Sequence, residues 1–116
     1  MDAIERQGRI EALAEDILTD QQLAAAYDQR RQENREALRR LREQAAKIKP
    51  TSRLATSTVN TGDFFIVVPT YKAQTVVEGA QKELEGAMDE VQLRLKKKIQ
   101  LLSELEGAGP MAATAK

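Results

Sequence analysis

The chain has 116 residues, and its 18 basic and 18 acidic side chains cancel to a formal net charge of zero. This length allows one domain at most, and the balanced charge gives no global case for binding nucleic acid or an anionic membrane surface. Aromatic residues make up 3% of the chain and charged residues 31%, which excludes an ordinary globular core and is typical of long helices and coiled coils.

The sequence lacks the residues on which most catalytic and metal sites depend. It contains neither His nor Cys, so the commonest general base near neutral pH is missing and a zinc site is not expected. Acidic residues such as Glu83 and Asp89 lie on a helix flank, where no enclosing pocket would shift their pKa values. There is also no glycine-rich phosphate loop. We therefore expect a non-enzymatic protein without catalytic residues, cofactor or metal.

Two further absences bear on location. No apolar run approaches the roughly 20 residues of a membrane span, and the segment 1–6 lacks the apolar core of a signal peptide. We expect a soluble protein of the cytoplasm, with the nucleus as a second location.

The segment from about 3 to 49 is predicted to form one long helix. Its polar seam residues are Asp20, Arg31 and Asn34, and Pro50 ends it because proline disfavours helix at the preceding residue. The apolar residues follow the 3-4 spacing of a coiled-coil seam. They are Ile10, Leu13, Ile17, Ala24, Tyr27, Leu38, Leu41, Ala45 and Ile48.

The segment from about 54 to 68 is predicted to be a β-hairpin, because β-branched and aromatic residues replace Ala, Glu and Lys there. Gly62 supplies the positive φ that a tight turn needs. In the second strand, alternate side chains point to opposite faces, and both faces are apolar: Phe64, Ile66 and Val68 on one, Phe65 and Val67 on the other. A lone hairpin is marginally stable and its edges invite other strands. We therefore expect other chains to cover it.

The segment from about 70 to 106 is predicted to be a second heptad-patterned helix that ends at Gly107. We interpret Gly79 and Gly86 as tolerated weak positions; the alternative is close approach of a neighbouring helix. Residues 107–116 are expected to be a disordered tail. The seam consists of Val77, Gln81, Leu84, Met88, Val91, Leu95, Lys98, Leu102 and Leu105.

A hairpin between two helices predicts a mainly α fold, an antiparallel two-helix coiled coil with the hairpin at the reversal. If the chain reverses at the hairpin turn, Asn34 should lie near Met88, and Asp20 should contact Lys98 in or beside the seam. Polar seam residues cost stability but can fix the register. We interpret Asp20, Arg31, Asn34 and Lys98 as register residues of this kind.

Two other surfaces have alternative interpretations. At the end far from the hairpin, ordinary two-helix packing is favoured over a weak apolar contact surface for client proteins; the residues are Ile4, Ile10, Leu13, Leu102 and Leu105. The basic runs 39–42 and 94–98 could contact nucleic acid or an acidic partner, but acidic residues interleave them and no aromatics alternate with the charges. Solvated faces with pairs such as Glu36–Arg40 are favoured.

Three stretches resemble the DNA-damage-regulated prefoldin-like branch of the β-type prefoldin subunits: 12–20, 28–38 and 62–69. The most specific part is Asn-Arg-Glu-Ala-Leu at 34–38, followed by Gly-Asp-Phe-Phe-Ile-Val-Val-Pro at 62–69. The resemblance covers roughly residues 9–106. It implies a prefoldin-like domain over residues 3–106.

The resemblance also implies a function. Prefoldins are ATP-independent co-chaperones in which six subunits join through their hairpins into a double β-barrel, and coiled-coil tentacles hold unfolded clients at their tips. The branch resembles subunits of the prefoldin-like module that works with RuvB-like ATPases. On this basis the expected subunit-interface residues are Val59, Phe64, Phe65, Ile66 and Val67. Aspartate at Phe65 or Ile66 should then block co-assembly.

The implied partners are other prefoldin or prefoldin-like subunits, RuvB-like ATPases and unfolded clients, with no membrane partner. Two alternatives remain open at this point. One is a subunit of the ordinary prefoldin hexamer that delivers actin and tubulin to a chaperonin. The other is a coiled-coil scaffold without chaperone activity.

Overall fold

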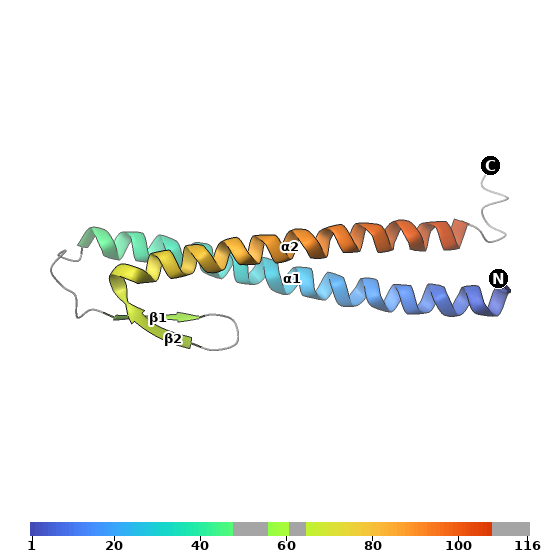
Figure 1. Ribbon diagram of the computed structural model, residues 1–116, viewed down its shortest axis with the longest axis horizontal. Coiled ribbons are helices and arrows are strands. Elements are labelled where there is room, and N and C mark those ends of the chain that lie inside the picture. The colour runs from blue at the N-terminus through green and yellow to red at the C-terminus, as the bar shows by residue number, and fades with distance from the viewer. Residues whose placement is uncertain (48–55, 61–64, 108–116) are drawn as a thin grey trace. The chain divides into compact units, whose positions relative to one another are not determined.

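The computed structural model describes residues 1–47, 56–60 and 65–107, and these form two long helices with a two-stranded antiparallel hairpin between them (Figure 1). The order is α1 (Ala3–Lys47), β1 (Thr56–Asn60), β2 (Phe65–Pro69) and α2 (Thr70–Gly107). The predicted mainly α class, with its hairpin between two coiled-coil helices, is confirmed.

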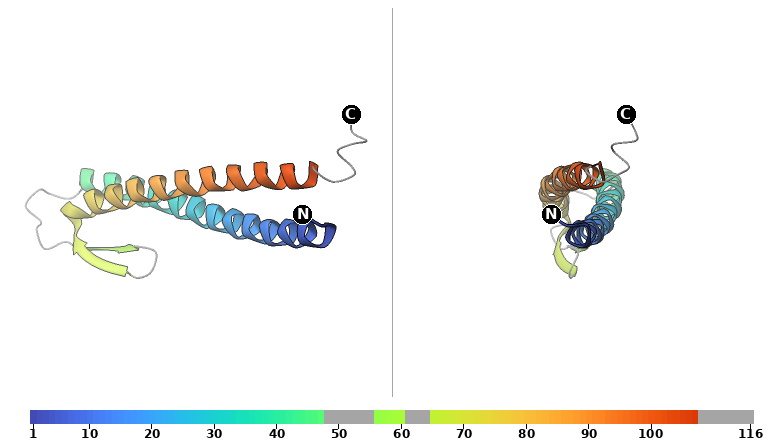
Figure 2. Two further views of the ribbon diagram at one scale, coloured as in Figure 1. Left: turned by 45° about the vertical axis from the view of Figure 1, so that its right-hand side comes forward. Right: turned by 90° about the vertical axis from the view of Figure 1, so that its right-hand side faces the viewer.

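Both helices begin where the sequence places them. Asp2 caps α1, since its Oδ1 accepts a hydrogen bond of 2.7 Å from the backbone N–H of Glu5. Helix α2 starts at Thr70 directly after β2 (Figure 2) and continues through Gly107, one residue beyond the expected end. The expected last turn of α1 at 48–49 and the expected tail from 108 onward lie outside the described residues.

The described part of the hairpin lies within the expected span of 54–68, except that β2 reaches one residue further, to Pro69. Its strands pair in the register Thr56↔Pro69 to Asn60↔Phe65. Residues 54–55 and 61–64 lie outside the described residues. Phe64, one of the expected interface residues, is among them.

The described residues form two compact units, and both helices contribute to each of them. One unit, the end unit, combines Met1–Ala26 with α2 from Met88 onward; the other, the hairpin unit, comprises Tyr27–Ala87. Ile17, Met88 and Val91 are the buried apolar side chains of the end unit.

The core of the hairpin unit joins the hairpin to both helices. Leu38 of α1, Val59 of β1 and Ala73 and Val77 of α2 are buried together. Several half-buried apolar residues pack against this cluster, Ile66 and Val68 of β2 among them. The chain's own helices thus cover one face of the hairpin, so the expectation that both faces await other chains is wrong for this face and stays a prediction for the opposite one.

The helix pairing in the hairpin unit is antiparallel, and its register differs in part from the one expected from the turn. Asn34 donates a hydrogen bond of 3.0 Å to Gln81 instead of lying near Met88. Arg42 lies 3.9 Å from Glu78. The expectation assumed a symmetric reversal at the turn, whereas in the structure α2 begins directly after β2.

Gly79 and Gly86 of α2 are surrounded by open space. A Cβ atom built at either position meets nothing within 4 Å among the described residues. No neighbouring helix approaches them closely within this part of the chain, so the interpretation as tolerated weak positions is confirmed.

Candidate interaction site

The two faces of the hairpin have different environments. The residues pair across the strands as Val59↔Ile66 and Thr58↔Val67. Val59 is 7% exposed and lies in the core of the hairpin unit, with Ile66 packed against it. Phe65 and Val67, on the other face, are 69% and 67% exposed. The structure therefore divides the expected interface residues between an inner face and an outer face.

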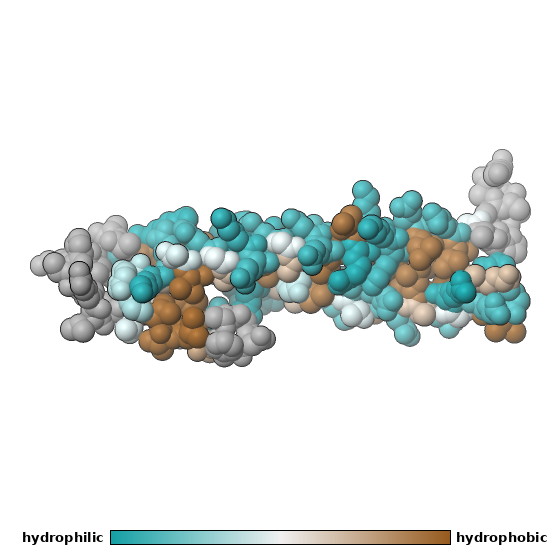
Figure 3. All heavy atoms as spheres, viewed as in Figure 1, coloured by the Kyte–Doolittle hydropathy of each residue, from teal (hydrophilic) through white to brown (hydrophobic). Residues whose placement is uncertain are grey.

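The outer face is an apolar surface next to polar neighbours. Its β2 side carries Phe65 and Val67, and its β1 side carries Thr58 and Asn60, which are the cross-strand partners of these two residues. Figure 3 shows apolar surface over the hairpin, below the largely hydrophilic surface of the helices in this view. Large apolar side chains that remain this exposed at one place are typical of a protein–protein contact surface.

A groove runs beside the free edge of β1. It has a volume of about 720 Å³, and all of its lining residues belong to the hairpin unit. The five residues of β1 line one wall, and α1 residues such as Ala37 and Leu41 line the other. Arg30 of α1 donates a hydrogen bond of 3.0 Å to Oδ1 of Asn60 and so ties the end of β1 to the helix. The strand wall of the groove is mostly polar, and Arg30 and Glu33 of α1 also line the groove.

The predicted contact between Asp20 and Lys98 is present. Asp20 is 5% exposed, and its Oδ2 lies 2.9 Å from Nζ of Lys98. Arg94 adds two hydrogen bonds of 3.2 Å to the same carboxylate. The hydrogen bonds from Arg94 and, after them, from Lys98 hold the pKa of Asp20 below its ordinary value.

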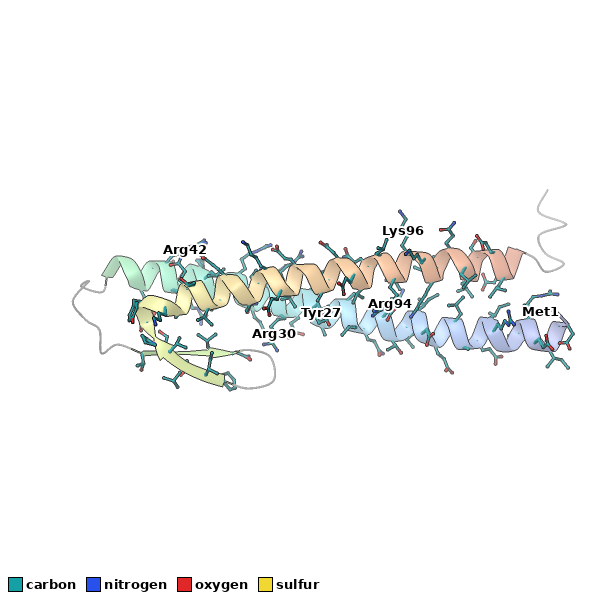
Figure 4. The ribbon with its side chains drawn as sticks, in the orientation of Figure 1. Met1, Tyr27, Arg30, Arg42, Arg94 and Lys96 are labelled. Atoms are coloured by element: carbon teal, nitrogen blue, oxygen red, sulfur yellow. The ribbon has the colours of Figure 1, made fainter. Side chains whose placement is uncertain are left out.

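Arg94 was not expected from the sequence as a partner of Asp20. Figure 4 shows Arg94 on the side of α2 toward α1, whereas Lys96 points away from α1. The signal was available, because Arg94 lies four residues before Lys98 and thus on the same helix face. Asp20, Arg94 and Lys98 are called the Asp20 triad below.

A second polar pair occupies the seam of the hairpin unit. Asn34 is 7% exposed and bonds to Gln81, whose Nε2 donates a hydrogen bond of 3.2 Å to the backbone carbonyl of Arg31. The Arg31 side chain itself pairs with Asp28, three residues earlier on α1. The assignment of Asp20, Arg31, Asn34 and Lys98 as register residues stays a prediction.

The expected client-contact residues all lie in the end unit. Ile4 is 85% exposed, while the other four residues of this set are half-buried: Ile10, Leu13, Leu102 and Leu105. Their role in client binding stays a prediction.

In the basic run 39–42, arginine side chains form ion pairs with glutamates of the same helix. Arg39 bridges Glu36 and Glu43, and Arg40 also contacts Glu36. The hydrogen bond from Arg39 is the main cause that lowers the pKa of Glu36, and the same bond raises the pKa of Arg39. These pairs are typical of a solvated helix face; that neither basic run binds nucleic acid stays a prediction.

Within residues 1–47, 56–60 and 65–107, no group of three or more acidic side chains is placed so that it could hold a metal ion. No described helix is long and apolar enough to cross a membrane.

Comparison with known proteins gives one consistent match. The chain is 31% identical over 98 residues to proteins named "p53 and DNA damage-regulated protein 1" from Homo sapiens, Rattus norvegicus and Pongo abelii. The match covers 84% of this chain and 69% of each relative. A comparison with protein-family models finds no match, and no solved structure matches significantly.

Proposed function

We propose that this chain, which belongs to the family of p53 and DNA damage-regulated protein 1, is a non-enzymatic, ATP-independent subunit of a prefoldin-like co-chaperone. It joins that complex through the outer face of its hairpin. Its partners are other prefoldin-like subunits, and RuvB-like ATPases act together with the complex. The proposed location is the cytoplasm, with the nucleus as a second site.

The observation that supports this proposal best is the unequal exposure of the hairpin faces. The inner face is anchored to the chain's own core through Val59, whereas Phe65 and Val67 stay about two-thirds exposed. Burying such apolar area favours association by about 25 cal/mol per Å² before the entropic cost of binding is deducted. An outer face held rigidly by an anchored inner face needs little reorganisation when a partner covers it.

The fold also supports a holding role for the helices. The half-buried apolar residues of the end unit, such as Leu13 and Leu102, offer weak contacts to exposed apolar segments of an unfolded protein. Weak contacts of this kind release a client without nucleotide hydrolysis. The holding role belongs to the complete complex, in which several subunits contact one client together.

The test is purification of the tagged chain from cells, followed by mass spectrometry of the recovered proteins. We expect prefoldin-like subunits and RuvB-like ATPases. Recovery of the ordinary prefoldin subunits alone would favour the alternative hexamer that serves actin and tubulin. Recovery of neither set, with no ATP-independent slowing of client aggregation by the purified complex, would leave the scaffold role.

The variant Phe65→Asp tests the surface. It should remove the co-purified subunits while leaving the helical content unchanged, because the side chain is 69% exposed. Leu93→Asp is the matched control: Leu93 is 56% exposed on α2, so its substitution should leave recovery intact. Normal recovery with Phe65→Asp would count against the hairpin as the site of assembly.

Ile66→Asp is a poorer test than the sequence suggested. Ile66 packs against the core of the hairpin unit, so a carboxylate there would disturb the chain's own fold as well as any interface.

A further inference from the structure

We propose that the Asp20 triad determines which helices pair: it keeps α1 and α2 of one chain together and disfavours parallel pairing of each helix with the same helix of a second copy. This role is independent of the proposed function. It concerns the specificity of a coiled coil and needs no partner protein.

The need for such a device follows from the sequence. Both helices carry a heptad seam over most of their length, and helices of this kind associate readily with copies of themselves. Two copies of α1, or two of α2, would bury much the same apolar residues as the intrachain pair. Apolar seam residues alone do not distinguish these arrangements.

Charge distinguishes them. In a parallel, in-register pair each seam residue meets its own counterpart, so Asp20 would meet Asp20 and Lys98 would meet Lys98. Like charges at close range in a seam repel each other strongly. In the structure the buried carboxylate of Asp20 instead lies 2.9 Å from Lys98 and 3.2 Å from Arg94. The same residues are attractive within the chain and repulsive between copies.

The triad also disfavours slipped pairings within the chain. A shift of one heptad along α2 would place Asp20 level with Val91 or Leu105 instead of Lys98. The carboxylate, which is 5% exposed in the observed register, would then lie against an apolar side chain without its cations. A buried charge without a partner is strongly unfavourable.

Parallel pairing between copies can be detected with a single cysteine, because the natural chain has none. Ala24→Cys places a thiol in the seam, four residues from Asp20. Two parallel copies of α1 would bring these thiols together and form a disulfide-linked dimer, whereas the intrachain pairing would keep them apart. The fraction of linked dimer is measured on the full-length chain under mild oxidation.

In the Ala24→Cys background, Asp20→Leu combined with Lys98→Leu should raise the linked fraction several-fold. The matched control, Glu15→Leu combined with Lys96→Leu, removes the same charges and adds the same apolar surface at exposed positions. It should leave the fraction at the level of the unsubstituted background. No increase with the first pair, or an equal increase with both pairs, would overturn the proposal.

A reversed triad separates charge complementarity from simple loss of polarity. Asp20→Lys combined with Arg94→Glu and Lys98→Glu keeps the attraction within the chain and the repulsion between copies. It should therefore keep the linked fraction low, with helical content measured by circular dichroism as a check on folding. A reversed triad that folds but dimerises like the leucine variant would also overturn the proposal.

Discussion

At the scale of single residues, Asp20 has a tightly constrained environment. It occupies a seam position that ordinarily holds an apolar side chain, and it is 5% exposed. Removing a carboxylate from water is costly unless the charge is paired and its lone pairs accept hydrogen bonds. Arg94 and Lys98 meet both conditions, since they supply opposite charge and donors to both oxygens.

The lowered pKa of Asp20 predicts a pH dependence of stability. Because the folded state holds the pKa below the unfolded value of about 3.9, the folded protein favours the ionised form. The stabilisation is therefore fully present above the unfolded pKa and is lost as the pH falls through the lower, folded value.

Thermal unfolding of the natural chain and of Asp20→Asn, measured between pH 7 and pH 2.5, checks this expectation. The natural chain should be the more stable at neutral pH, and the difference should shrink below about pH 4. Glu36→Gln serves as an exposed control, since the pKa of Glu36 is also lowered, chiefly by Arg39, but exposed pairs contribute little to stability. A difference between natural chain and Asp20→Asn that stays constant over the whole pH range would contradict the assignment.

The sequence predicted part of this seam. The heptad frame placed Asp20 and Lys98 in the seam because it depends only on spacing, and the chain reversal at the hairpin turn placed the two residues within reach of each other. The frame could not identify Gln81 as the partner of Asn34, since that contact depends on the exact register of the two helices. The observed register pairs the buried amide of Asn34 with the half-buried amide of Gln81, and leaving the Asn34 amide unpaired would cost about 1–3 kcal/mol.

At the scale of the elements, the weakest positions of α2 are Gly79 and Gly86. Both are exposed within the helix and have open space where a Cβ atom would stand. Glycine in a helix interior is less favourable than alanine by roughly 0.5–1 kcal/mol, mainly because the unfolded chain loses more conformational freedom. Neither glycine gains a close packing contact in return.

Gly79→Ala and Gly86→Ala should therefore each stabilise the chain by about 0.5–1 kcal/mol, measured by urea denaturation. The contrasting variant is Ala73→Leu, at a position with 0% exposure in the core of the hairpin unit. The larger side chain should destabilise the chain by about 1–3 kcal/mol through overpacking. Destabilisation by either glycine substitution would indicate that a neighbour approaches α2 at that position.

The sequence predicted the elements better than it predicted which hairpin face is covered. Helix starts follow from local chemistry, such as the cap at Asp2, and strand preference follows from β-branched residues. Local chemistry does not determine which face of the hairpin is covered, because β2 is apolar on both sides. The alternation of its side chains is therefore compatible with either face packing against the helices. The helices decide it, by placing Leu38 and Ala73 against Val59.

At the scale of the whole molecule, the chain buries little apolar area for its length. Among the described residues no large side chain is less than 2% exposed, whereas Phe65, Val67 and Tyr71 are each about two-thirds exposed. A chain with so small a core has a modest free energy of unfolding by itself. Any partner that binds only the folded state then raises its stability by mass action.

This linkage predicts that the chain melts at a higher temperature in the complex than alone. A partner present at about 100 times its dissociation constant stabilises the folded state by about 2.7 kcal/mol, which corresponds to a shift of roughly 10 °C or more for a domain of this size. The two faces of the hairpin should respond differently to substitution. Phe65→Asp should abolish the shift but change the stability of the isolated chain by less than about 1 kcal/mol, since the side chain is mostly exposed.

Val59→Asp should do the opposite, because it places a carboxylate in the chain's own core. The isolated protein should lose most of its cooperative unfolding transition, as followed by circular dichroism. Assembly would then fail because the chain is unfolded, and not because a contact is missing. If both variants lowered the stability of the isolated chain equally, the outer face would be part of the fold, and the surface proposed for assembly would have to lie elsewhere, with the groove beside β1 as the next place to test.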